Sequence, residues 1–266
     1  MGGTVSETMD AFHRGRFHIL QPKGRGHRAG MDAMLLASLV ADDRACRIAD
    51  LGAGAGAAGM AVAARLEKAE VTLYERSPEM ADFARRSLLL PENAAFSARV
   101  SVCEADVTLR AKARVEAGLP DEHFHHVIMN PPYNDAGDRR TPDALKAEAH
   151  AMTEGLFDEW IRTAGAIMVP GGQLSLIARP QSVADIIAAC GSRFGGMEIT
   201  LIHPRPGEDA VRMLVTAIKG SRARLSFRAP LVMHETGSHA FTTFVDDLNN
   251  GRAAYSRNVR AIRPAP

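Results

Sequence analysis

Cysteines and long apolar runs are scarce in this chain, and each shortage excludes a class of protein. The three cysteines among 266 residues, Cys46, Cys103 and Cys190, are far apart and form no Cys-x-x-Cys pair. This spacing excludes a zinc knuckle and a disulfide framework, and it indicates reduced thiols in a cytoplasmic protein. Apolar runs such as residues 60–64 are far shorter than the roughly 18 residues of a membrane span. The first ten residues lack the basic and apolar regions of a signal peptide, so we expect none.

An excess of charge of one sign is also lacking. The chain has 32 Lys and Arg against 31 Asp and Glu, for a net charge of +1. A site for a polyanion must therefore be a local patch. Hydrophobic residues make up 46% and charged residues 24%, which is typical of a globular protein and excludes a disordered, collagen-like or coiled-coil chain. No stretch has the composition of a linker, so we expect one domain over residues 1–266.

Strand and helix patterns alternate through the middle of the chain. Short apolar runs typical of strands lie at 47–51, 71–75, 98–104, 124–129 and 173–178. Helical spacing of apolar residues occurs at 32–40, 57–68, 78–90, 154–169 and 183–190. This alternation predicts a mainly parallel sheet with helices on both faces.

The two ends of the chain have different patterns. Residues 1–27 are rich in Gly, His and Arg, and we expect a flexible basic arm with a short ordered part near 17–20. Segments 197–203 and 211–219 are extended with no helix between them, which predicts an antiparallel pair at one edge of the sheet. A further extended segment at 224–233 and a helix at 240–249 lie within a basic extension, residues 220–266.

Alternating glycines follow the first predicted strand. Asp50 precedes Gly52, Gly54 and Gly56, and such glycines let a backbone approach a ligand closely. Ligands of open α/β sheets bind at the carboxyl ends of the strands. Residues 54–59 also read as GxGxxG, a dinucleotide signature. The charged Asp50 instead favours a cofactor with a cationic amino acid part, whose ammonium group this carboxylate approaches directly or through water. A turn that only packs a helix is the alternative.

Two further acids follow predicted strands. Glu75 lies 21 residues after Gly54, at the end of the second strand, where a carboxylate suits the hydroxyls of a ribose. Asp106 follows the third strand, where it suits the exocyclic amine of an adenine. The alternative for Asp106 is the N-cap of a helix that begins at Val107.

The tetrapeptide Asn130-Pro131-Pro132-Tyr133 follows the fourth strand directly. Two prolines make a rigid turn, which presents the side-chain oxygen of Asn130 and the carbonyl of Pro131 as acceptors for one NH₂ group. These acceptors favour a localised lone pair on the nitrogen, which then attacks a sulfonium methyl in line, while the Tyr133 ring stacks on the planar substrate. Catalysis here comes from positioning and fixed dipoles. A turn without chemistry is the alternative.

These motifs together resemble the class I S-adenosylmethionine-dependent N-methyltransferases. Over roughly residues 17–250 the chain is similar to the bacterial tRNA(Val) adenine-N6 methyltransferase family, which methylates the adenine 3′ of the anticodon. The similarity includes segment 26–37 and the strand at 211–215. It implies a doubly wound, Rossmann-like α/β fold with a seven-stranded, mainly parallel sheet and one antiparallel strand. It also implies S-adenosylmethionine as cofactor, with binding roles for Asp50, Gly52, Gly54, Glu75, Asp106 and Asn130; the glycine pattern adds Gly56.

Both ends of the chain are basic. Residues 219–263 contain eight Lys or Arg against three acids, and the first 28 residues add five more cations. We expect these ends to contact the backbone of an RNA, the alternative being solvated tails. Candidate substrate-binding residues are Arg28, Arg139, Arg140 and Arg212, and the polar segment 134–153 is a candidate lid or substrate loop. We expect no metal site.

Other functions fit parts of the pattern. A glutamine N5-methyltransferase of release factors uses the same NPPY chemistry, but only 49 residues precede Asp50, which leaves little room for a helical substrate domain. Other nucleic-acid N-methyltransferases share the same motifs. A non-catalytic RNA-binding module is a further alternative, but such a module does not need the complete Asn-Pro-Pro-Tyr tetrapeptide that this chain has. A nicotinamide oxidoreductase would leave the presence of this tetrapeptide unexplained.

Overall fold

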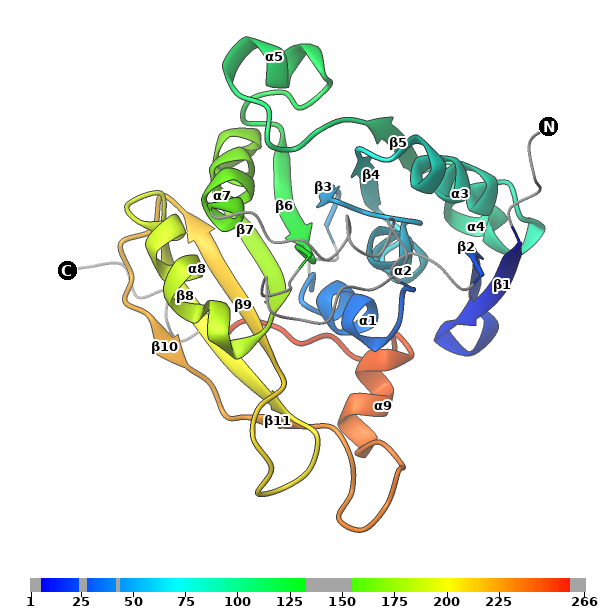
Figure 1. Ribbon diagram of the computed structural model, residues 1–266, viewed down its shortest axis with the longest axis vertical. Coiled ribbons are helices and arrows are strands. Elements are labelled where there is room, and N and C mark those ends of the chain that lie inside the picture. The colour runs from blue at the N-terminus through cyan, green and yellow to red at the C-terminus, as the bar shows by residue number, and fades with distance from the viewer. Residues whose placement is uncertain (1–5, 24–27, 42–43, 133–154, 259–266) are drawn as a thin grey trace.

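A large mixed sheet runs through the molecule (Figure 1). The computed structural model describes residues 6–23, 28–41, 44–132 and 155–258. In sheet order, the seven long strands are β8 (Phe194–His203), β9 (Arg212–Lys219), β7 (Met168–Ala178), β6 (Phe124–Met129), β3 (Cys46–Leu51), β4 (Ala69–Glu75) and β5 (Val100–Glu104). Strand β9 is antiparallel to β7 and β8, and the other long strands pair in parallel. The predicted sheet and its antiparallel pair are confirmed.

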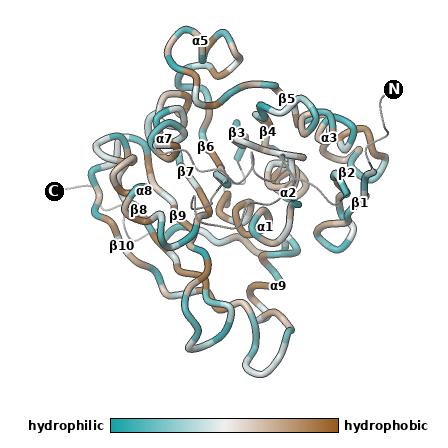
Figure 2. The backbone as a smooth tube through the Cα atoms, viewed as in Figure 1, coloured by the Kyte–Doolittle hydropathy of each residue, from teal (hydrophilic) through white to brown (hydrophobic). Residues whose placement is uncertain are grey.

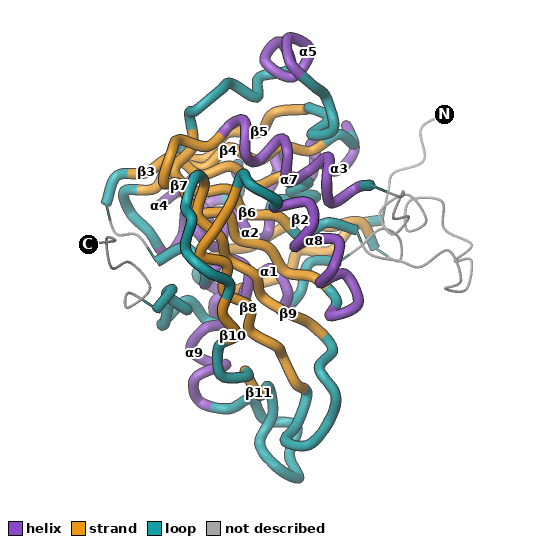
Figure 3. Tube along the Cα trace, turned by 90° about the vertical axis from the view of Figure 1, so that its left-hand side faces the viewer, coloured by secondary structure: helices purple, strands orange, loops and turns teal. Residues whose placement is uncertain are grey.

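The predicted number of strands needs one correction. Two short strands, β10 (Ser226–Phe227) and β11 (Leu231–Val232), pair in parallel with β8, so the described sheet has nine strands. They lie in the segment predicted only as extended. The loops that follow β8 and β11 extend from the same end of the molecule (Figure 3), where Arg205 and His239 lie 3.4 Å apart.

Helices cover both faces of the sheet, as predicted. One face carries α1 (Met31–Ser38), α2 (Ala57–Arg65), α3 (Pro78–Leu88) and α9 (Thr243–Asn249), and the other carries α7 (Leu156–Ile167) and α8 (Val183–Cys190). The shorter helices are η2 (Pro91–Asn93), α4 (Ala94–Ser97), α5 (Ala111–Glu116) and η3 (Pro180–Ser182). Helix α3 begins as its sequence predicts, because Pro78 occupies the first turn and Ser77 Oγ accepts from the N–H of Met80 (3.4 Å).

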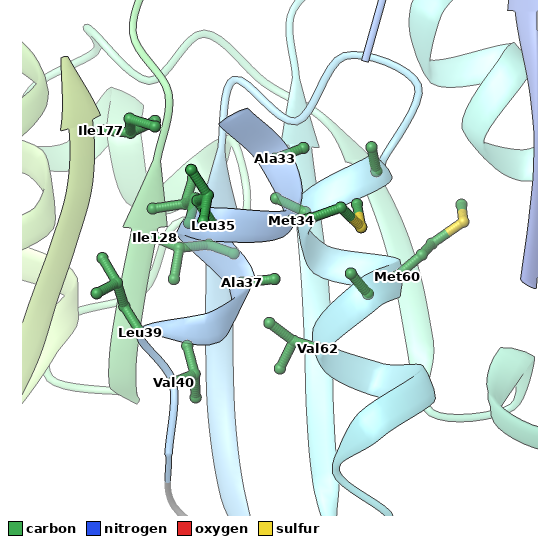
Figure 4. Close-up of a cluster of buried hydrophobic side chains, with 14 of the residues drawn as sticks. Ala33, Met34, Leu35, Ala37, Leu39, Val40, Met60, Val62, Ile128 and Ile177 are labelled. Atoms are coloured by element: carbon green, nitrogen blue, oxygen red, sulfur yellow. The ribbon is translucent and has the colours of Figure 1, made fainter. Parts of the chain in front are cut away.

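Each face has its own apolar core. Figure 4 shows part of the core around α1 and α2, in which Leu35 lies beside Ile128 of β6 and Met34 points towards α2; Met60 and Ile177 of β7 belong to the same cluster. Hydrophobic residues concentrate on these buried elements, whereas the β8–β9 loop is mainly hydrophilic (Figure 2). Strand β6 is buried along almost its whole length, as parallel strands covered on both faces are.

The N-terminal segment corrects the expectation of a flexible arm. Strands β1 (Glu7–Phe12) and β2 (Phe17–Pro22) form an antiparallel hairpin around the short helix η1 (His13–Gly15). Strand β2 buries Phe17 and Ile19 completely. Asn93 joins this hairpin to the fold, because its side chain accepts from the N–H of His18 (2.9 Å) and donates to the carbonyls of His18 and Ser87 (both 2.7 Å). The sequence missed this pairing since its turn, His-Arg-Gly, is not a usual hairpin sequence.

The basic extension also folds back on the sheet. Glu198 of β8 is buried, 3.6 Å from Arg257 and 3.7 Å from Arg228. The Arg228 guanidinium also lies over the ring of Tyr255, 4.2 Å from its centroid. At the hairpin turn, Arg14 pairs with Asp246 of α9 at 2.8 Å. The hairpin at residues 7–22 and the extension up to residue 258 therefore both pack on the body of the protein.

Within the described ranges, no helix combines the length and the apolar character that crossing a bilayer requires.

We predict that Asn93→Ala lowers the free energy of unfolding by about 2–3 kcal/mol, because the fully buried amide makes three hydrogen bonds to the hairpin and to the end of α3. Urea unfolding measures the change. The exposed neighbour Glu92 supplies the control, Glu92→Ala, which is expected to leave stability nearly unchanged. Equal stability of the two variants would contradict the role of Asn93 as the hairpin anchor.

Candidate active site

The carboxyl ends of four parallel strands bring the predicted site residues to one edge of the sheet. Leu51 of β3 lies opposite Tyr74 of β4 and Met129 of β6, and Glu75 lies opposite Glu104 of β5. The residues that end or follow these strands therefore share this edge: Gly52, Glu75, Asp106 and Asn130. This is the edge at which open α/β sheets bind ligands.

The glycine loop is held against β4. The backbone N–H groups of Gly52 and Ala53 both donate to the carbonyl of Tyr74 (2.8 and 2.9 Å). Gly52 has φ +69°, and a Cβ there would overlap the ring of Trp160. Gly52 and Gly54 are partly exposed, whereas Gly56 is buried at the start of α2, where a Cβ would lie 2.7 Å from Leu73. Packing thus accounts for both Gly52 and Gly56, whereas a Cβ at Gly54 would meet nothing closer than Met80 at 3.8 Å; Gly52 and Gly54 are the two that stay partly exposed.

Asp50 lies beneath this loop and is 2% exposed. Its Oδ2 accepts a hydrogen bond from the N–H of Gly59 in the first turns of α2 (2.8 Å). Burial raises the pKa of Asp50 to about 7; the Gly59 hydrogen bond opposes this shift, and the nearby charge of Glu75 adds to it. A cationic group at this edge would therefore meet a carboxyl group that becomes fully charged only in its presence or at higher pH.

The Glu75 carboxylate is held by two backbone donors. Oε2 accepts from the N–H of Gly54 and Oε1 accepts from the N–H of Ser77, both at 2.8 Å. Each oxygen still has a lone pair for a ligand hydroxyl. Glu75 therefore joins the glycine loop to the start of α3 and stays partly exposed.

Asp106 forms a turn rather than the helix N-cap considered from sequence. Its Oδ1 accepts from the N–H and the hydroxyl of Thr108 (2.8 and 2.7 Å), and α5 begins only at Ala111. Nearby, the Thr163 hydroxyl of α7 donates to the carbonyl of Val107 (2.7 Å). Helix α7 thus fixes this turn at the same edge of the sheet.

Asn130 and Pro131 follow β6 at the middle of this edge, between the ends of β3 and β7. Asn130 is partly buried and Pro131 is buried. The predicted residues Tyr133, Arg139 and Arg140, with segment 134–153, lie outside the described residues. The roles of Asn130, Pro131 and Tyr133 in catalysis stay predictions.

Arg28 and Arg212 make ion pairs within the protein. Arg28 contacts Asp10 of the hairpin (2.7 Å), and Nε of Arg212 contacts Asp32 of α1 (2.9 Å). These pairs tie the ends of α1 and β9 to their neighbours. Several other basic residues of the two ends also pair with acids: Arg14, Lys219, Arg228, Arg252 and Arg257. The expected basic surface is therefore smaller than the residue count indicates.

Sequence reasoning missed Trp160, the residue of α7 that covers Gly52. Its place on the apolar side of a predicted helix indicates only a core residue. Its position against the glycine loop depends on how α7 packs on the sheet, which no local pattern reveals. In the described part of the chain, no group of three or more His, Cys, Asp or Glu residues is arranged to hold a metal ion.

Comparison with known proteins shows which family the chain belongs to. The family model for the methyltransferase small domain matches residues 28–199. A tRNA1(Val) (adenine(37)-N6)-methyltransferase of Pedobacter heparinus is 27% identical over 208 residues, which cover 77% of this chain and 83% of that protein. A release factor glutamine methyltransferase of Deinococcus radiodurans is 32% identical over 149 residues, 53% of this chain and 49% of that protein.

A solved structure is also similar. The crystal structure of a predicted O-methyltransferase from Agrobacterium tumefaciens is 83% identical, with a TM-score of 0.77, covering 86% of this chain and all of that one. The fold and the site define an S-adenosylmethionine-dependent methyltransferase with a Rossmann-like sheet. The chain belongs to the methyltransferase small domain family.

The Asp50 carboxyl gives a pH prediction for the protein without cofactor. A folded-state pKa of about 7 against 3.8 means that the native state retains a proton that the unfolded state loses between these values. Asp50 should therefore contribute a fall in the free energy of unfolding as pH rises through this window, of roughly 2–3 kcal/mol between pH 5 and 8. This contribution is measured as the difference between the wild type and Asp50→Asn, because burial lowers the pKa of His13 to about 4 and so acts in the opposite direction below pH 6.5. Asp50→Asn should remove this slope. Urea unfolding at several pH values measures it.

Glu67→Gln on an exposed residue is the control, and it should keep the wild-type slope. Parallel pH profiles for the wild type and Asp50→Asn would show that Asp50 does not titrate in this range.

Proposed function

We propose that this methyltransferase transfers a methyl group to the exocyclic N6 of an adenine in RNA, specifically a tRNA adenine next to the anticodon. The observation that carries the proposal is the Asn130-Pro131-Pro132 turn, placed directly after β6 at the edge where the glycine loop and Glu75 lie. The relatives named as tRNA1(Val) (adenine(37)-N6)-methyltransferases support the choice of substrate.

Different residues of this edge bind different parts of the cofactor. Gly52 and Gly54 approach it with their backbone, and Asp50 faces its ammonium group directly or through water. Glu75 accepts from the ribose hydroxyls and Asp106 from the adenine amine. When bound, S-adenosylmethionine supplies an electrophilic methyl on a sulfonium.

The NPP turn activates the acceptor. The side-chain oxygen of Asn130 and the carbonyl of Pro131 accept the two hydrogens of the N6 amine, which favours a lone pair pointed at the methyl. The nitrogen forms its bond to the methyl carbon as the carbon–sulfur bond breaks, and one amine proton then leaves to water. Catalysis comes from position and fixed acceptors, without a strong base.

Two rival acceptors use parts of the same site. A glutamine side chain of a release factor presents the same planar NH₂, and the Deinococcus radiodurans relative favours it. Ahead of Asp50, however, the described residues form a hairpin and α1, which pack on the methyltransferase core. A hydroxyl acceptor, suggested by the name of the Agrobacterium tumefaciens protein, must lose its proton for attack, which two hydrogen-bond acceptors promote poorly.

The substrate is tested by transfer of tritium from labelled S-adenosylmethionine. Bulk tRNA from cells that lack this gene is the acceptor, followed by nucleoside analysis. We expect label in N6-methyladenosine, with a rate that falls as salt rises because the enzyme contacts phosphates. Label in a release-factor glutamine, or in a ribose or other hydroxyl, would overturn the proposed substrate.

The role of the turn is tested by Asn130→Ala. We predict that turnover falls at least a hundredfold, because one of the two acceptors is lost, while the affinity for S-adenosylhomocysteine changes less than threefold. Single-turnover kinetics and calorimetry measure the two quantities. Asn130→Asp keeps an acceptor oxygen and should retain more activity than the alanine variant. Equal losses of affinity and rate would show that Asn130 only binds the cofactor.

A further inference from the structure

Residues 222–227 form an exposed strip along one side of the large sheet, called the β10 strip below. Strand β10 pairs with β8, and no strand of the described residues pairs with its other side (Figure 1). The ring of Phe227 is 64% exposed, and Leu225 is exposed as well. An exposed apolar side chain is common on protein surfaces, so the charges around this ring decide which partner the strip fits.

The strip lies in a basic part of the chain. Between Asp209 and Glu235 the chain has five Lys or Arg residues and no acid. Three of these cations pair with acids elsewhere in the fold: Arg212, Lys219 and Arg228. The other two, Arg222 and Arg224, are exposed, and the described residues supply no ion pair for either. Two guanidinium groups without a counter-charge therefore lie within five residues of the exposed Phe227 ring.

Backbone hydrogen bonds hold the strip against β8. The carbonyl of Ala223 accepts from the N–H of Gly196 (2.7 Å), and the N–H of Arg228 donates to the carbonyl of Ile199 (2.8 Å). Between these two contacts, β10 pairs in parallel with β8. The strip is therefore an ordered part of the sheet rather than the solvated tail considered from sequence. Its backbone loses little freedom when a ligand binds.

Arginines beside an exposed aromatic ring match the chemistry of a nucleic acid. Guanidinium groups bind phosphates, and an aromatic ring stacks on the face of an unpaired base. A single-stranded part of an RNA offers both groups together. The overall charge of the chain is close to neutral, so attraction of a polyanion must come from a local group of cations such as this one.

The strip is separate from the candidate active site. Four strand spacings separate β10 from β6 in the sheet, which is roughly 19 Å at the usual spacing of strands. Phe227 lies opposite Ile199, four residues and roughly 13 Å before the carboxyl end of β8 at His203. A mononucleotide beside Asn130 is too short to reach the strip, whereas an RNA of the size of tRNA is long enough.

We propose that the β10 strip is an RNA-binding surface outside the active site, where Arg222 and Arg224 contact phosphates and Phe227 stacks on an unpaired base. The inference rests on the proposed function, since the RNA that occupies the strip is the one whose adenine lies at the NPP turn. It assigns part of the selection of the RNA to a surface that does not contact the cofactor.

Removal of the two arginine charges tests the phosphate contacts. The double variant Arg222→Gln/Arg224→Gln is compared with the wild type in the binding of fluorescently labelled, unmodified tRNA at several salt concentrations. We expect its Kd to rise about tenfold near 100 mM salt, and the slope of log Kd against log salt concentration to fall by about 1.5–2, because two phosphate contacts are lost. A purely structural role of the arginines would not change this slope.

Lys68→Gln/Lys112→Gln is the matched control for charge. Both lysines are exposed and lie outside the strip, one before β4 and one on α5. This variant should keep the wild-type salt slope and a Kd for tRNA within threefold. Both double variants should keep the affinity for S-adenosylhomocysteine and the turnover at saturating tRNA, because the strip is remote from the methyl transfer.

Phe227→Leu tests the stacking contact. Leucine keeps an apolar side chain at this exposed position, so the melting temperature should stay the same while stacking is lost. We expect the Kd for tRNA to rise about fivefold with an unchanged salt slope, and Phe227→Tyr to bind like the wild type. Phe244→Leu, at a phenylalanine of α9 that is 45% exposed, is the control and should also bind like the wild type.

The outcomes separate this inference from the proposed function. Wild-type tRNA binding by Arg222→Gln/Arg224→Gln, in an enzyme that methylates tRNA, would overturn the strip alone. Loss of release-factor methylation in this variant, with tRNA binding unchanged, would also overturn it and assign the strip to a protein partner. Binding of tRNA through the strip without methylation of an adenine would support the strip and refute the proposed substrate. A wild type without affinity for tRNA would refute both.

Discussion

The hydrogen bond from the Gly59 N–H to the buried carboxyl of Asp50 is the interaction on which the site depends. It joins the end of β3 to the first turns of α2 and so fixes the loop between them. A Cβ at Gly59 would overlap Leu73, so the close approach needs a glycine there. This arrangement buries the Asp50 carboxyl group in an apolar layer, which disfavours its charged form and raises its pKa. A cationic ligand at this edge would offset that cost.

The glycines of the loop serve two purposes. Gly56 and Gly59 lie below the surface, where Leu73 leaves no room for a side chain. Gly52 and Gly54 lie on the accessible side, and their neighbours are the Trp160 ring, the Met80 side chain and the Glu75 carboxylate. The same short sequence thus makes the helix pack closely and presents its backbone to a ligand. A literal GxGxxG pattern does not separate these purposes.

Hydrogen bonds and ion pairs hold the described parts of the two chain ends against the rest of the protein. The hairpin is held by Asn93 and by the contact of Arg28 with Asp10, and the last described residues return to Glu198. A buried glutamate with two guanidinium partners is strongly penalised if either partner is removed. Arg228 and Arg257 therefore stabilise the buried Glu198, and Arg222 and Arg224, for which the described residues supply no ion pair, are better candidates for contacts with the proposed RNA substrate.

The sequence alone determined the sheet, the edge and the residue types on it. The spacing of apolar residues, with the glycines and prolines at the ends of the elements, predicts strands β3 to β7 and their helices, because each of these signals lies within a few residues of the chain. The order Asp50, Glu75, Asp106, Asn130 follows, since parallel strands end on the same side.

Only the tertiary structure decided what depends on distant packing: the hairpin anchored by Asn93, the short strands beside β8, and the burial of Asp50. It also decided the placement of Trp160 over Gly52, since these residues are 108 positions apart in the sequence and come together only when α7 packs on the sheet. Local sequence patterns therefore determine the helices and strands of this protein, whereas long-range packing determines which charged groups of the site are buried and which side chains line it.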